Sequence, residues 1–316
     1  MKRSFLKGIF VLSILWFHSG CSDDRPALKD ITVDKTSVSI LLGYKEQITA
    51  LPVPLNAESQ TFEWISENPA IVKVSRFGVI EAVEEGTVNV IVKIGSIQKT
   101  IPVTVIDPIV IPDPIGSWLF DDPANLTKAT IGNDLVTVGE GFVSVEGPSL
   151  TNRAARVPLG SHFIATHGIN PVEVPGLGRA VIQYTLLFHI KAPDVNQWRS
   201  FYQTDVNNVG DAEVFINTSG QIGVGATGYS TERITANTWH RVIVTVNLGV
   251  TGVRYYLDGQ EIRTSTTTDA RFSMQDIVLI FADNDGDDAE LDAAEVTMWD
   301  VALDIDQVKK LQRISQ

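Results

Sequence analysis

The chain has 316 residues, enough for about two domains at roughly 150 residues each. Its 44% hydrophobic and 20% charged residues are typical of a globular protein and argue against a disordered chain. The net charge of −13 excludes binding to nucleic acid or to an anionic lipid surface through a basic patch. A single cysteine excludes an internal disulfide framework.

The N-terminus has the pattern of a secretion signal. Three basic residues precede an apolar run, residues 9–17, that is too short to cross a membrane as a stable helix. The following Ser19-Gly20-Cys21 resembles a bacterial lipobox, with His18 where an aliphatic residue is usual. This resemblance implies a lipoprotein signal peptide at residues 1–20 and a lipid on Cys21. Ordinary secretion with an unmodified cysteine is the alternative.

Residues 21–27 are interpreted as an acidic tether after the lipidated cysteine. Ser22-Asp23-Asp24 is similar to the signal that directs lipoproteins of Bacteroidetes-type bacteria to the outer face of the outer membrane. We therefore expect an outer-membrane protein that faces the cell exterior and meets the membrane through its lipid alone.

Residues 28–106 are predicted to form a small antiparallel β-sandwich. Short β-rich runs recur between turn signals, and residues 71–75, 88–94 and 97–105 alternate apolar and polar side chains, as strands with one buried face do.

The motifs in this segment point to a family. WISENPAIVKVS at residues 64–75, followed by GVIEA at 78–82, resembles bacterial Ig-like domains of group 2. Such domains are most often spacers or adhesion modules, and we expect Trp64 in the core. The proline-rich residues 107–115 are predicted to be a stiff linker to the second domain.

Residues 116–316 are long enough for a larger β-sandwich, with one helix near the C-terminus that Asp304 is expected to cap. An apolar strand at residues 277–282 leads into an acidic turn and then into a second strand at residues 291–299. Carboxylates so close together are either solvated or hold a cation, and oxygen ligands suit calcium. A second oxygen-rich turn contributes two more candidate ligands. The candidate calcium ligands are Asp283, Asp285, Asp287, Asp288, Asp205 and Asp211.

The larger segment resembles the laminin-G-like, or concanavalin A-like, jelly rolls. The similarity lies in an ordered series of short motifs: GSWLFDD at residues 116–122, NTWHRV at 237–242, YYLDG at 255–259, and a terminal strand with Asp292, Glu295 and Trp299. The resemblance implies a jelly roll of a class that includes lectins, adhesion modules and some glycosidases, many of which hold calcium.

A sugar-binding surface needs exposed aromatic rings beside polar groups. The candidates next to loops are Trp198, Arg199, Tyr202 and Tyr229. Core positions are the alternative for these side chains.

One carboxylate cluster favours an enzyme instead. Glu290, Asp292 and Glu295 resemble the motif of retaining β-glucanases, in which they would be nucleophile, neighbour and general acid. A β-bulge would place them on one face, and a retaining pair lies about 5–5.5 Å apart. The motif lies near the C-terminus, however, and lacks flanking aromatic residues.

The sequence thus predicts an all-β surface lipoprotein with an Ig-like sandwich and a concanavalin A-like jelly roll. The function that we expect is carbohydrate binding, with calcium as the one cofactor. A glycoside hydrolase using Glu290 and Glu295 is the first alternative. Adhesion to a neighbouring surface protein is the second.

Overall fold

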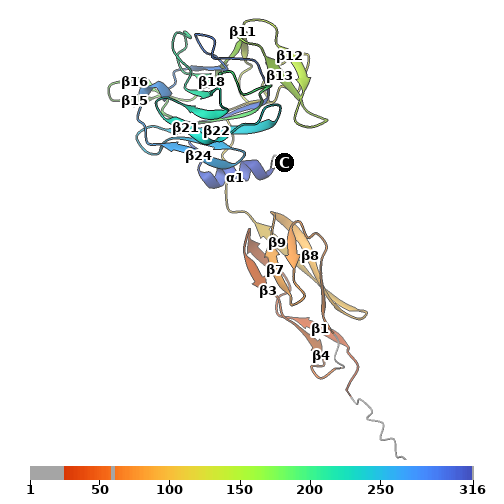
Figure 1. The fold of residues 1–316 in the computed structure, drawn as a ribbon. Coiled ribbons are helices and arrows are strands. Elements are labelled where there is room, and N and C mark those ends of the chain that lie inside the picture. Colours follow the sequence, from red (N-terminus) through yellow and green to blue (C-terminus); the bar gives the residue numbers. More distant parts are fainter. Residues whose placement is uncertain (1–24, 58–60, 315–316) are drawn as a thin grey trace, which may run out of the picture. The chain divides into compact units, whose positions relative to one another are not determined.

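The computed structural model describes residues 25–57 and 61–314. By internal contacts the chain divides into two compact units, Met1–Pro108 and Ile109–Gln316 (Figure 1). The signal peptide and Cys21 lie outside the described residues, so the lipid anchor remains a prediction. None of the helices in the described ranges has the length and apolar character needed to span a membrane.

The small unit consists of short antiparallel strands with one parallel pair, β2 with β9. They form a four-stranded sheet in the order β2-β9-β8-β5, a three-stranded sheet β3-β7-β6 and a pair β1-β4. The strands are β1 (Asp30–Val33), β2 (Val38–Leu41), β3 (Lys45–Gln47), β4 (Ala50–Val53), β5 (Glu63–Ser66), β6 (Val72–Val74), β7 (Val79–Ala82), β8 (Gly86–Ile94) and β9 (Ile97–Ile106).

The core of the small unit follows the predicted alternation. On β8, Val88, Val90 and Val92 are buried while the residues between them are partly exposed. Trp64 departs from the prediction, because it is only half buried at the edge of this core. Its ring lies over Gly78, where an added Cβ would come within 2.7 Å of the indole. A glycine with φ +81° is therefore required beneath this ring.

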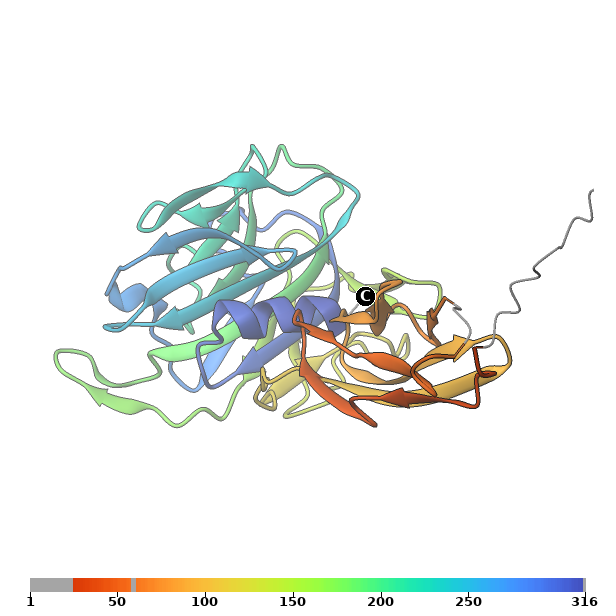
Figure 2. The same cartoon turned by 90° about the horizontal axis from the view of Figure 1, so that it is seen from below.

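The large unit is a sandwich of two antiparallel sheets (Figures 1 and 2). The eight-stranded sheet has the order β12-β13-β26-β17-β22-β23-β24, with β10 also on β26; the seven-stranded sheet has the order β11-β14-β25-β18-β19-β20-β21. A hairpin β15-β16, a short 3-10 helix η1 and one α-helix complete the unit.

The elements of the large unit are β10 (Gly116–Trp118), β11 (Val136–Val138), β12 (Val143–Glu146), β13 (Arg153–Val157), β14 (His162–Thr166), β15 (Val172–Val174), β16 (Gly178–Ala180), β17 (Gln183–Lys191), β18 (Arg199–Gln203), β19 (Val214–Ile216), β20 (Gln221–Val224), β21 (Gly228–Arg233), β22 (Trp239–Asn247), β23 (Gly252–Leu257), β24 (Gln260–Ser265), η1 (Ala270–Phe272), β25 (Ile277–Ile280), β26 (Leu291–Trp299) and α1 (Ile305–Ile314). The predicted fold class, all-β with two sandwiches and one terminal helix, is confirmed.

Helix α1 covers part of the outer face of the eight-stranded sheet (Figure 2). Val308 and Leu311 pack against Leu187 and Trp299 in a second, smaller core. The predicted cap is present: Asp304 Oδ1 accepts the amide hydrogens of residues 306 and 307, each at 2.9 Å. This pairing satisfies donors that the first turn of a helix otherwise leaves free.

Part of the proline-rich segment 107–115, which the sequence predicts as a stiff linker, is bonded to the large unit. Trp299 Nε1 donates to the carbonyl of Pro112 at 2.9 Å, and Gln307 Nε2 donates to that of Val110 at 2.8 Å. Lys310 Nζ donates to the carbonyl of Ile109 at 2.8 Å. Prolines leave carbonyl groups without strand partners, and donors of the large unit bind these groups. The segment after Pro108 therefore belongs to the large unit.

Candidate functional site

The acidic loop begins with a reversal of the backbone directly after β25. Phe281 has φ +65°, a left-handed conformation that is rare for a bulky residue and costs about 1–3 kcal/mol. Its amide donates to the Phe201 carbonyl at 3.0 Å, and its ring lies 5.8 Å from that of Phe188. Core packing thus holds the residue that directs the acidic loop.

Asp283 organises this loop. Its side chain is buried, at 6% exposure, and its Oδ1 accepts the Ala212 amide hydrogen at 3.0 Å. Its Oδ2 accepts the amide hydrogens of Asp285 and Asp287 at 3.3 and 3.4 Å. Carboxylate oxygens of these three aspartates lie within 4.8 Å of one another. Three carboxylates at such a spacing form a candidate metal site.

The second acidic turn, residues 205–211, lies directly beside the first. Asn208 Nδ2 donates to the Asp283 carbonyl at 3.3 Å, and Asn284 Nδ2 donates to the Val209 carbonyl at 3.2 Å. The two turns that the sequence predicted as partners are therefore adjacent. The two oxygens of Asp205 accept the amide hydrogens of residues 207 and 209 within its own turn, and its role as a ligand stays a prediction.

The electrostatics of the cluster disfavour three bare charges. Burial raises the pKa of Asp283 and of Asp288 above the usual range. Burial also raises the pKa of Asp287, and the neighbouring carboxylates of Asp283 and Asp211 raise it further. A cation at this point would compensate the negative charges whose desolvation causes these shifts.

Two oxygens near this cluster have no protein partner. Oδ1 of Asp288 and Oδ1 of Asn208 are buried, and neither finds a hydrogen bond within the described residues. Buried acceptors without a donor are uncommon, and their usual explanation includes an ion or water. Calcium takes six to eight oxygen ligands in flexible geometry. Carboxylate and amide oxygens from two loops are the donors that calcium uses, so the residues present fit this ion.

An aromatic pair borders the acidic loop. The rings of Trp198 and Tyr229 meet edge to face with centroids 6.0 Å apart, and both side chains are half-buried. Trp198 also meets Phe215 at 5.7 Å, which holds it against the core. Burial raises the pKa of Tyr229, Arg271 opposes this shift, and Asp287 and Asp211 add to it. The phenol therefore lies within electrostatic reach of the acidic cluster.

Two of the predicted sugar-contacting residues are inside the protein instead. Arg199 is 1% exposed, and it donates to Asp194 Oδ2 at 3.1 Å and to the Glu290 carbonyl at 2.8 Å. Tyr202 is fully buried, with its hydroxyl 3.0 Å from that of Tyr184. The prediction that Arg199 and Tyr202 contact a glycan is wrong, because Tyr202 lies in the core of the sandwich and Arg199 is buried among its hydrogen-bond partners.

A polar pocket of 430 Å³ opens on the other side of residues 205–211. Arg271 joins it to the acidic cluster, since its Nη2 donates to the Ala212 carbonyl at 2.8 Å, and the Ala212 amide donates to Asp283. The pocket is lined by Leu177, Arg179, Ala180, Thr204, Asp205, Gly210, Asp211, Glu213, Arg271, Ser273, Met274 and Gln275.

Glu213 and Arg271 are residues of this site that the sequence analysis missed. Glu213 is 3% exposed, and burial raises its pKa to about 8. Its Oε2 accepts the Thr204 amide hydrogen at 2.6 Å, and its Oε1 lies 3.9 Å from Arg271 Nε. The sequence contained a signal for Glu213, because this residue directly precedes the apolar strand β19. A carboxylate next to a buried strand needs a hydrogen-bonding or charged partner.

The carboxylates of the hydrolase alternative lie elsewhere, on the outer face of the eight-stranded sheet. The predicted bulge is present: the register of β26 against β17 shifts between Asp292 and Glu295, and they face Lys191 and His189. Asp292 pairs with Lys191 at 3.1 Å, and Glu295 pairs with Arg241 at 2.7 Å. Arg156 contacts both Asp292 and Glu290, at 2.8 and 3.6 Å.

This second cluster is thus a network of ion pairs within the sheet. A pocket of 200 Å³ adjoins Glu295, less than half the volume of the pocket beside the acidic loop. Each of the three carboxylates has a cationic neighbour, so their charges are compensated by the protein itself. Within residues 25–57 and 61–314 no ion pair to Asp283, Asp285 or Asp287 is present, so the acidic loop is the better candidate for a ligand site.

Comparison with known proteins identifies both units. Residues 27–105 match the family of bacterial Ig-like domains of group 2. Residues 169–309 match the concanavalin A-like lectin/glucanases superfamily. No curated protein matches the chain.

Solved structures resemble the large unit at low identity. Domain 4 of an extracellular arabinanase from Geobacillus stearothermophilus, in complex with arabinotriose, shares 17% identity at a TM-score of 0.46; the match covers 63% of this chain and 98% of that domain. The receptor-binding domain of botulinum neurotoxin type G shares 13% sequence identity at a TM-score of 0.44, and that of type D shares 15% identity at a TM-score of 0.46. These matches cover 65% and 64% of this chain and 52% of either neurotoxin domain. The chain therefore carries a bacterial Ig-like domain of group 2 followed by a domain of the concanavalin A-like lectin/glucanase superfamily.

Proposed function

We propose that the large unit binds carbohydrate with the help of calcium, and that the small unit carries it as a spacer at the cell surface. The observation that supports this proposal is the proximity of an acidic cluster to an aromatic pair. Burial raises the pKa of Tyr229, Asp287 of the cluster raises it further, and the Tyr229 ring meets that of Trp198. The membership of this unit in a lectin and glucanase superfamily agrees with the proposal but does not determine its function.

The parts of this surface suit a sugar. When bound, calcium would supply positive charge and open coordination positions for hydroxyl oxygens. The rings of Trp198 and Tyr229 are half-buried, and the C–H groups of a sugar ring would pack against their faces. The adjoining pocket offers hydrogen-bonding side chains, including Arg271 and Gln275. A binding module needs only such a preformed surface.

Affinity electrophoresis tests the sugar-binding role. Soluble residues 26–316 would be run through gels containing a panel of polysaccharides, once with calcium and once with chelator. We expect retardation in at least one gel and its loss with chelator. The exposed Asp285 allows a mild variant, Asp285→Asn, which should abolish retardation, while Asp300→Asn, an exposed aspartate outside the loop, should not.

Other outcomes assign the protein to another class. Migration as in an empty gel with every polysaccharide would refute carbohydrate binding and favour adhesion to a protein. New reducing ends in the retarding polysaccharide would indicate hydrolysis. That activity would then be tested in Glu295→Gln, because Glu295 borders the 200 Å³ pocket on the outer sheet face.

Thermal unfolding tests the metal separately. A ligand that binds only the folded state stabilises it by about 2.7 kcal/mol at a hundredfold excess over Kd. For a unit of this size that corresponds to about 5–10 °C in Tm. Chelator should lower the Tm of the calcium-loaded protein by this amount, and Asp285→Asn should show no such shift. Identical curves with and without chelator would remove calcium from the proposal.

The surface location rests on Cys21 and has its own test. Cys21→Ala should move the protein from the membrane fraction to the soluble fraction when it is expressed with its signal peptide. Membrane attachment of this variant would refute the lipid anchor and leave the glycan-binding proposal unaffected.

A further inference from the structure

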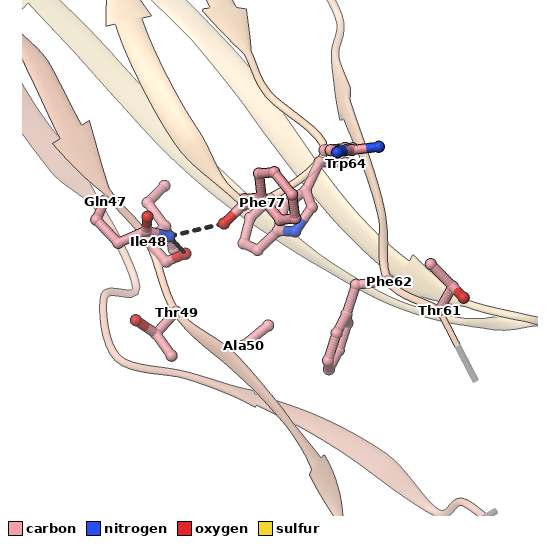
Figure 3. Close-up of a pocket in the computed structure, with 9 residues that line it drawn as sticks. Gln47, Ile48, Thr49, Ala50, Thr61, Phe62, Trp64 and Phe77 are labelled. Carbon is pink, nitrogen blue, oxygen red and sulfur yellow. Dashed lines mark hydrogen bonds between the residues drawn. The ribbon is translucent and has the colours of Figure 1, made fainter. Parts of the chain in front are cut away.

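The small unit has a pocket of its own, although it is proposed to act as a spacer. The pocket has a volume of 550 Å³, within the range of small-ligand sites. Figure 3 shows the side chains of Phe62, Trp64 and Phe77 around one open space, with Thr49 and Ala50 on the opposite side. It is lined by Gln47, Ile48, Thr49, Ala50, Thr61, Phe62, Trp64, Arg76 and Phe77.

The aromatic side chains are held in place but not covered. Phe77 is 67% exposed, and with Phe62 and Trp64 it forms an aromatic lining of the pocket. Ser75 Oγ accepts the Phe77 amide hydrogen at 3.3 Å, and Gln47 Nε2 donates to the Phe77 carbonyl at 2.8 Å (Figure 3). Trp64 is fixed by its contact with Gly78. The rings of Phe77 and Trp64 are thus held in position and remain accessible to solvent.

The charge of the pocket is positive in a strongly negative protein. The guanidinium of Arg76 lies over the Phe77 ring, 4.6 Å from its centroid. Among the described residues no hydrogen bond or ion pair to Arg76 is present, and no acidic residue lines the pocket. The net charge of the chain is −13. An arginine fork above an aromatic ring is suited to an anionic group that presents two oxygens, such as a carboxylate or a sulfate.

On the side of Ile48 and Thr49, the backbone groups that border the pocket are already bonded. The Ile48 amide donates to Gly78, and the Thr49 amide donates to Asp34 Oδ1 at 2.7 Å. The Ile48 carbonyl accepts Gln47 Nε2 at 2.7 Å. Peptides that extend a sheet need free backbone groups at its edge. On this side of the pocket, recognition therefore relies on ring faces, hydroxyl and amide side chains and one cation.

We propose that this pocket binds an acidic sugar residue of a polysaccharide. The ring of the sugar would lie against Phe77 and Trp64, and its carboxylate or sulfate would bind Arg76. Thr49, Thr61 and Gln47 border the same space with polar groups that can meet sugar hydroxyls. This site is independent of the acidic loop, which lies in the other unit. The small unit is then a second binding module and not only a spacer.

The test uses soluble residues 26–316 in gels that contain polygalacturonate, dextran sulfate or neutral dextran. All runs contain chelator, so that the proposed calcium site does not contribute. We expect retardation by polygalacturonate or dextran sulfate and none by neutral dextran. The gel that retards the protein tells whether the anion is a carboxylate or a sulfate. Phe77→Ala and Arg76→Gln should each weaken the apparent Kd at least tenfold.

Matched controls separate this site from general surface effects. Tyr44 is 65% exposed in the same unit but outside the pocket, so Tyr44→Ala should bind as the wild type does. Lys73→Gln removes the same charge as Arg76→Gln from an exposed position. Equal losses in Arg76→Gln and Lys73→Gln would mean non-specific charge attraction.

Three other results would overturn the proposal. One is retardation of Phe77→Ala and Arg76→Gln equal to that of the wild type. Another is migration of the wild type unchanged by either acidic polysaccharide. The third is binding of polyglutamate with the same dependence on Phe77 and Arg76, which would assign the pocket to acidic peptides. None of these results depends on whether the large unit binds a neutral glycan through calcium.

Discussion

Glu213 makes the stability of the large unit depend on pH in an unusual direction. Burial raises its pKa from 4.5 to about 8. Because the folded state binds the proton more tightly than the unfolded state does, the free energy of unfolding falls as pH rises through this window. The 3.5-unit difference corresponds to a maximum of about 5 kcal/mol at 1.36 kcal/mol per unit.

The variant Glu213→Gln isolates this contribution. A glutamine keeps an oxygen that can accept the Thr204 amide hydrogen but carries no charge at any pH. Between pH 5 and pH 9 the free energy of unfolding of the wild type should fall by about 4 kcal/mol more than that of the variant. The difference is smaller than about 5 kcal/mol because part of that contribution is already lost at pH 5. The variant should therefore be the more stable protein at pH 9.

Urea unfolding at pH 5, 6, 7, 8 and 9, followed by tryptophan fluorescence, measures this difference. The m-values should agree, so that midpoints report stability alone. Glu173→Gln removes an exposed glutamate of β15 and should retain the pH dependence of the wild type. If the free energies of unfolding of Glu213→Gln and the wild type change in parallel with pH, the reasoning is refuted. Arg271, and not a bound proton, would then compensate the charge of Glu213.

Two further predictions concern the outer face of the eight-stranded sheet. Burial, and next Arg241, lower the pKa of His189 from 6.5 to about 4. The neutral form therefore contributes about 2–3 kcal/mol to the free energy of unfolding above pH 6.5, and this contribution is lost as pH falls to 4. In urea unfolding, the free energy of unfolding of His189→Gln should lie closer to that of the wild type at pH 4.5 than at pH 7. Asp304→Ala removes the cap of α1 and should cost about 1 kcal/mol, or about 2–4 °C in Tm by calorimetry, with Asp300→Ala as the exposed control. A Tm for Asp304→Ala equal to that of the control would mean that α1 is held by packing alone.

Much of the architecture could be predicted because local patterns in this chain agree with the fold. The alternation in β8 and β9 and the capping residue Asp304 each act within a few residues, and the structure has them as expected. The pairing of the two acidic turns followed from the family resemblance, and hydrogen bonds from Asn208 and Asn284 bear it out.

The misassigned residues depend on contacts that are distant in sequence. All five residues of β18 are buried: Phe201 and Tyr202 lie in the core of the sandwich, and Arg199 and Gln203 bind loop backbone. Arg199 reaches the carbonyl of Glu290, and Gln203 reaches that of Gly210 at 2.6 Å. No pattern within β18 reveals these loops. Trp64 shows the opposite case, since a family motif suggested a core position and an adjoining pocket leaves it half exposed.

The way in which the chain enters the large unit has a mechanical consequence. Donors from α1 and β26 bind the carbonyl groups of Ile109, Val110 and Pro112, and β10 then pairs with β26. A pull on the chain at Pro108 therefore loads several hydrogen bonds between the first and the last segments of the unit before it reaches the sandwich. Bonds that share a load break together and resist more force than bonds that open one after another. These bonds thus fasten the two ends of the unit to each other.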